Sequence, residues 1–105
     1  MSDAVRRLRE DVVERAVRGS AMATEPVRRA AFDNRDVDAR ARGLIEKVAR
    51  HAWKVSDADV AATKAAGFSE DEIFELTICA ALGQATRQLD AALAALNKAE
   101  ERGKR

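Results

Sequence analysis

The sequence is poor in several residue types. It has one cysteine, one proline and no tyrosine, and aromatic residues make up 4% of its 105 positions. A lone cysteine cannot close an intramolecular disulfide, which excludes a small fold held together by disulfides. Aromatic and β-branched residues build sheets, whereas the abundant alanine of this chain favours helices. We therefore predict an all-α protein.

Long apolar runs are also missing, so no segment is expected to span a membrane. The first ten residues, MSDAVRRLRE, are charged and no apolar segment follows them, so no secretory signal is expected. These two features predict a cytoplasmic protein.

The net charge of +1 is unevenly distributed. Residues 1–54 contain 13 Lys and Arg against 9 Asp and Glu, and residues 55–105 contain 6 against 9. In the first half, the basic segments RRLRE, PVRRA and DARAR are interrupted by acids and lack an aromatic platform. A nucleic-acid binder is expected to carry a more concentrated basic patch. A small helical regulator that binds nucleic acid is therefore the least favoured of three functional hypotheses.

Apolar residues at helical spacing predict five helices in a single domain over residues 1–105. The first helix is predicted over 3–18. The second follows Thr24, which has the character of an N-cap. The third is predicted over 36–54, where Gly43 is a weak point that a closely packed neighbouring backbone would explain.

The last two helices have clear start signals. Ser56 with Asp59 predicts a weaker form of the capping box for the fourth helix, and Ser69 with Glu72 predicts a full one for the fifth. Gly67 is expected to end the fourth helix.

The fifth helix is predicted to be the longest, and its polar tail, AEERGKR, is expected to fray. Its main apolar face is predicted to need several packing partners because it is so broad. That face consists of Phe74, Ile78, Ala81, Leu82, Ala85, Leu89, Ala92, Leu93 and Leu96, and it is widened by Ile73, Leu76 and Ala80.

Three short motifs occur between residues 51 and 96. They are VSDADV at 55–60, AAGFS at 65–69, and the start of the fifth helix, where Glu75 precedes Leu76. With these motifs the segment resembles the second half of the carboxymuconolactone decarboxylase and AhpD-like alkylhydroperoxidase superfamily. The resemblance implies a small AhpD-like helical bundle.

The active-site motif of that superfamily is a Glu, a later C-x-x-C pair and a His after the pair. If Glu75 is placed on the Glu, the cysteine positions fall near Arg87 and Asp90, and the His position falls at Ala94. In the family chemistry one cysteine attacks a peroxide and the second resolves the sulfenic acid as a disulfide. The resemblance therefore implies the fold without this activity.

An enzyme would have to use Glu75, Cys79 and His51 in an unusual arrangement, as an atypical peroxidase or decarboxylase. The alternatives are a buried Cys79 that acts as a small hydrophobe, a structural His51 and a salt-bridged Glu75. Glu75 could also share a cleft with Arg87. Trp53 is expected to pack against the fifth helix or at a subunit contact.

No metal site or cofactor is expected, because one cysteine and one histidine do not provide recognisable ligand spacing. We favour a protein without the family's activity, acting as a homo-oligomer or as a subunit that completes a protein partner's site. The broad apolar face of the fifth helix is the reason, since so short a chain buries little on its own.

Overall fold

The computed structural model describes residues 3–103 of the chain. Its elements, in chain order, are α1 (Asp3–Arg18), α2 (Glu25–Asp33), α3 (Ala39–Arg50), the 3-10 turn η1 (Ala52–Lys54), α4 (Asp57–Ala65) and α5 (Glu70–Gly103). This part of the chain contains no strand, so the prediction of an all-α bundle of about five helices is confirmed. None of these helices combines the length and apolar character that crossing a bilayer requires.

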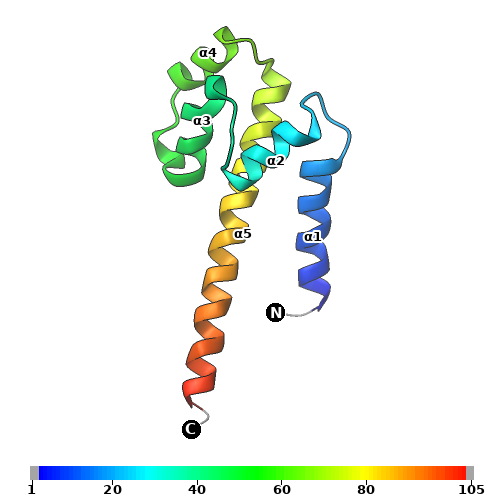
Figure 1. Cartoon of the computed structure of the whole chain (residues 1–105), viewed down its shortest axis with the longest axis vertical. Helices are drawn as coiled ribbons and strands as arrows, with labels where there is room; N and C mark the ends of the chain where they lie inside the picture. The colour runs from blue at the N-terminus through cyan, green and yellow to red at the C-terminus, as the bar shows by residue number, and fades with distance from the viewer. Residues whose placement is uncertain (1–2, 104–105) are drawn as a thin grey trace.

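The molecule is elongated, with extents of 58 × 28 × 21 Å. One end, the head, contains α2, α3, η1, α4 and the beginning of α5 (Figure 1). From the head, α1 and the remainder of α5 extend as two antiparallel helices, which we call the stalk (Figure 1). Because α5 passes through both parts, one helix carries the core of the head and half of the stalk.

The helix boundaries follow the predicted caps, except around the third helix. That helix is shorter than the predicted range 36–54 because Asp36 has a left-handed φ of 57° and Asp38 forms the N-cap. The Asp38 side chain accepts a hydrogen bond from the backbone N–H of Arg40 at 2.9 Å. The fraying predicted for AEERGKR is wrong for residues 99–103, which are helical, and residues 104–105 lie outside the described part.

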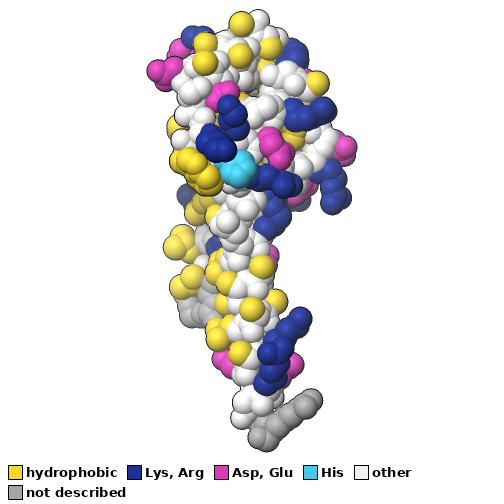
Figure 2. Space-filling model, turned by 90° about the vertical axis from the view of Figure 1, so that its left-hand side faces the viewer, with side chains coloured by type: hydrophobic (Ala, Val, Ile, Leu, Met, Phe, Trp, Pro, Cys, Tyr) yellow, Lys and Arg dark blue, Asp and Glu magenta, His cyan; other side chains and the backbone are white. Residues whose placement is uncertain are grey.

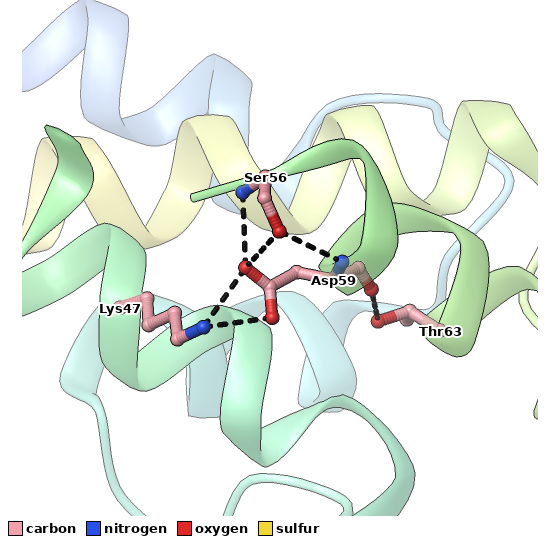
Figure 3. A network of polar contacts seen from close by, with 4 residues as sticks. All are labelled: Lys47, Ser56, Asp59 and Thr63. Carbon is pink, nitrogen blue, oxygen red and sulfur yellow. Dashed lines mark hydrogen bonds and ion pairs between the residues drawn. The ribbon is translucent and has the colours of Figure 1, made fainter. Parts of the chain in front are cut away.

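A polar network fixes α4 against α3 (Figure 3). The predicted capping box is confirmed: the Ser56 Oγ accepts from the Asp59 N–H, and the Asp59 carboxylate accepts from the Ser56 N–H at 2.9 Å. Lys47, on α3, donates to both oxygens of the same carboxylate at 2.8 and 3.0 Å. The hydrogen bond from Lys47 is the main reason that the pKa of Asp59 is lowered.

The start of α5 and the end of α4 also match the sequence. The Ser69 N–H donates to Glu72 at 3.0 Å, and the Glu72 N–H donates to the Ser69 Oγ at 3.1 Å, which confirms the second capping box. Gly67, just after α4, has a φ of 119°, a conformation that favours glycine.

The buried face of α5 differs from the predicted one. Phe74 is 66% exposed and Leu96 is 55% exposed, so the main predicted face is not the core face. The residues that α5 buries are those that were expected only to widen that face, together with two smaller ones: Ile73, Leu76, Cys79, Ala80 and Gly83. They pack against α2 and α3 in a core that also contains Val17, Ala31, Ala41, Leu44, Ile45 and Val48.

Close approach of two helices explains this choice of face. A Cβ added to Gly83 would lie 1.8 Å from the carbonyl oxygen of Phe32, near the end of α2. Only a glycine allows the two backbones to come so close. No close approach explains Gly43, because nothing lies within 4 Å of a Cβ built there. The small residues Ala80 and Gly83 therefore lie on the buried side of α5, whereas Leu89 and Leu96, farther along the helix, are 36% and 55% exposed.

Candidate functional site

Cys79, the only candidate nucleophile, is buried. Its side chain is 1% exposed, and its Sγ donates to the carbonyl oxygen of Ala16 at 3.3 Å. Burial raises the pKa of the Cys79 thiol; Arg28 lowers it in part, and Glu75 adds to the rise. Because the thiolate is the reactive form, this environment opposes nucleophilic chemistry. The expectation of a small buried hydrophobe is confirmed.

Glu75 lies one turn before Cys79 and holds the connection between α1 and α2. Its carboxylate accepts the backbone N–H of Met22 at 2.8 and 3.0 Å, and that of Ala23 at 2.9 Å. Thr24 is the N-cap residue of α2, as predicted, but its side chain makes no capping hydrogen bond. The Glu75 carboxylate instead satisfies the N–H groups just before the helix, an arrangement that nothing in the sequence reveals.

His51 ends α3 and is exposed, as Figure 2 shows for the single histidine of the chain. Its ring lies edge-on to the ring of Trp53, with 5.2 Å between centroids. No hydrogen bond within residues 3–103 joins His51 to Glu75 or Cys79. Trp53 is 77% exposed, so the expected packing against the long helix is wrong, while a subunit contact remains a prediction. The three candidate residues thus form no assembled catalytic group.

Arg87 does not share a cleft with Glu75. Its Nη1 donates to the carbonyl oxygen of Phe32 at 2.7 Å, and its Nη2 donates to Gln84 at 3.2 Å. A cation at the C-terminal end of α2 satisfies a free carbonyl and complements the helix dipole. Arg87 therefore supports the contact between α2 and α5.

Several arginines of the basic segments also make internal contacts. Arg28 is buried and donates to the carbonyl oxygens of Ala23 and Ala16 at 3.1 and 3.0 Å. Arg40 pairs with Asp38 at 2.8 Å, and its guanidinium lies 4.7 Å from the ring centroid of Phe68. These side chains serve the fold, which removes part of the charge that a nucleic acid would need.

The strongest candidate site is a groove between α1 and α5, with a volume of about 280 Å³. Three apolar side chains of α1 form one wall: Val5, Leu8 and Val12 are 53%, 65% and 43% exposed. Most of the remaining lining is also apolar and consists of Val13, Leu82, Ala85 and Leu89, with Arg9 and Thr86 as the polar members. The groove therefore exposes apolar side chains of the stalk to solvent.

A stripe of apolar residues on α5 passes through the groove and continues along the helix. Residues recur in steps of four and three, the spacing of a coiled-coil face: Ile78, Leu82, Ala85, Leu89, Ala92, Leu96 and Ala99. Hydrophobic side chains are visible along the stalk in Figure 2. This stripe lies on the side of α5 opposite to the core face, so the head does not cover it.

The last part of α5, residues 91–103, is called the overhang below. Every side chain in it is exposed except Leu93, which is half-buried. Directly before the overhang, Arg9 of α1 and Asp90 of α5 form an ion pair at 2.9 Å. The overhang thus carries part of the apolar stripe past the end of its own bundle.

The described residues contain no group of three or more His, Cys, Asp or Glu side chains arranged to hold a metal ion. Comparisons of the chain with protein-family models, curated proteins and solved structures give no match. The groove and the apolar stripe are the features of this molecule that indicate a function.

Proposed function

We propose that the protein is a non-enzymatic member of the AhpD-like group and that it acts by self-association through its stalk. The observation that carries this proposal is the apolar groove of α1 and α5 together with the apolar stripe that continues onto the overhang. Contiguous apolar surface that is exposed to solvent often marks an interaction surface.

The candidate catalytic residues support a non-enzymatic role. A peroxidase needs an accessible thiolate, whereas Cys79 is 1% exposed and burial raises the pKa of its thiol. A proton relay needs a free carboxylate close to a base, whereas Glu75 is bound to two backbone N–H groups. The atypical peroxidase or decarboxylase thus lacks a nucleophile and a base that are ready to act.

The stability of the overhang gives a second reason to expect a partner that packs against the stalk. The overhang continues a helix that is already nucleated, but packing of an apolar face supplies most helix stability, and every overhang side chain except the half-buried Leu93 is exposed. The leucines of the overhang provide an apolar face for such packing, as Leu96 illustrates with an exposure of 55%. A second copy of the chain presents a complementary surface of the same kind.

Analytical ultracentrifugation over a concentration series tests the proposal. We expect the mass to rise from one chain to a fixed multiple, and Leu89→Glu, in the groove, to shift the association to much higher concentration. Gln88→Glu is the matched control, because it introduces the same carboxylate one position away, outside the stripe and the groove lining. A wild-type protein that stays monomeric up to the highest soluble concentration would refute the proposal.

A further inference from the structure

We infer that two copies pair antiparallel through α5, with the overhang of each copy seated in the groove between α1 and α5 of the other. This inference rests on the proposed self-association and specifies its geometry. It joins two features that one chain cannot satisfy by itself: an open apolar groove and an apolar helix end without cover from the described residues.

The order of leucine and alanine along the stripe selects the antiparallel direction. An antiparallel pair can be aligned so that Leu82 faces Ala99, Ala85 faces Leu96, and Leu89 faces Ala92. Each large side chain then fills the space beside a small one, as a densely packed interface requires. In a parallel pair in register, leucines would face leucines and alanines would face alanines, which would leave gaps at the alanine layers.

The groove has the shape that this pairing needs. Ala85 is a small residue in its lining, and Leu8 and Val12 line the same groove from α1. The large Leu96 of the second copy would enter above Ala85 and contact the α1 wall. The segment from Ile78 to Gly103 is about 39 Å long at 1.5 Å per residue, long enough for the two α5 helices to overlap along the whole stalk.

The pairing closes on itself. Under a two-fold axis each copy provides one groove and one overhang, so both grooves and both overhangs are covered and the assembly stops at two chains. The α1 and α5 helices of the two copies then form a four-helix bundle with an apolar interior. A pairing in which one overhang entered one groove without this symmetry would leave a free end and continue into a filament.

Complementation between two variants tests the geometry. Leu8→Glu damages the groove and leaves the overhang intact, whereas Leu96→Glu damages the overhang and leaves the groove intact. We expect either variant alone to raise the dissociation constant at least about tenfold, because each change occurs twice in the dimer. An equimolar mixture restores part of the association, since the mixed dimer has one contact between an intact groove and an intact overhang, while the other contact carries both glutamates. Ala94→Glu, on the other side of the overhang, is the control and keeps wild-type association.

Disulfide trapping provides a second readout with a nearly intact interface. We expect oxidation of a mixture of Leu8→Cys and Leu96→Cys chains to give a cross-linked heterodimer. Leu8→Cys alone, or Leu8→Cys mixed with Ala94→Cys, should give little cross-linked product. The native thiol of Cys79 is buried and does not compete.

The outcomes separate the inference from the proposed function. A mixture that stays monomeric and also fails to cross-link, while the wild type dimerises, overturns the antiparallel seating and leaves self-association standing. If each glutamate variant dimerises as strongly as the wild type, the seating is also overturned. A monomeric wild type overturns the proposed function itself. Both exposed leucines can be changed without entering the core, and circular dichroism verifies that the variants stay helical.

Discussion

Replacing Gly83 by alanine tests the contact on which the choice of buried face depends. The added Cβ would lie 1.8 Å from the Phe32 carbonyl oxygen, whereas ordinary contact begins at 3.4 Å. The helices would have to separate by about 1.6 Å (3.4 − 1.8), because the obstacle is helix backbone and cannot rotate away. Separation also stretches the 2.7 Å hydrogen bond from Arg87 to the same oxygen.

The magnitude follows from two opposing effects. Overpacking a core costs about 1–3 kcal/mol, and a rigid backbone obstacle places Gly83→Ala near the upper end of that range. The higher helix propensity of alanine returns about 1 kcal/mol. We therefore expect a net loss of about 2 kcal/mol, which corresponds to a Tm about 8–16 °C lower in a domain of this size.

Gly43→Ala is the matched control, because it makes the same change inside α3 where nothing lies within 4 Å of the new Cβ. Only the propensity gain remains there, so we expect the Tm to rise by about 4–8 °C. Thermal unfolding followed by circular dichroism measures both variants. A Gly83→Ala protein as stable as the wild type, beside a stabilised Gly43→Ala protein, would refute the close approach of α2 and α5.

Three further predictions concern single side chains. Cys79 should resist iodoacetamide at pH 8 in the folded protein and react once urea unfolds it, as mass spectrometry would report; rapid labelling of the native state would contradict its burial. Glu75→Ala should lower stability by about 1–3 kcal/mol in urea unfolding because it leaves the N–H groups of Met22 and Ala23 without their acceptor, whereas Glu101→Ala should change little. The Arg40 side chain holds the pKa of Asp38 at about 2, so the stabilisation from this pair should be complete above about pH 4 and be lost as the pH falls through 2. Carboxyl NMR titration checks the Asp38 pKa directly, and a value near 3.8 would contradict the prediction.

Local signals in the sequence predict the helices well. Ser56 with Asp59, and Ser69 with Glu72, satisfy each other within a few residues, so their geometry depends on the local chain alone. The third helix was predicted too long because its apolar spacing continues past its ends. The left-handed conformation of Asp36, which stops it, leaves no comparable signal.

The packing of α5 could not be predicted in the same way. The sequence presents two apolar faces on this helix, and hydrophobicity alone favours the face with the larger residues. The structure buries the smaller one because Gly83 lets α2 approach, a fact about the distance between two helices that no local pattern contains. The role of Glu75 could not be predicted either, because its hydrogen-bond partners, Met22 and Ala23, lie in a loop that is distant in the sequence.

Because α5 is one continuous helix, the rotational orientation of its outer end is fixed relative to the head. It runs from Glu70 to Gly103 as one helix, so its outer end turns with the head. One residue inserted after Asp90 would rotate the apolar side of the overhang by about 100°, because a turn takes 3.6 residues. Seven inserted residues would nearly restore the original direction and only lengthen the helix by about 10 Å. The number of residues between head and tip thus sets the direction in which the tip presents its leucines.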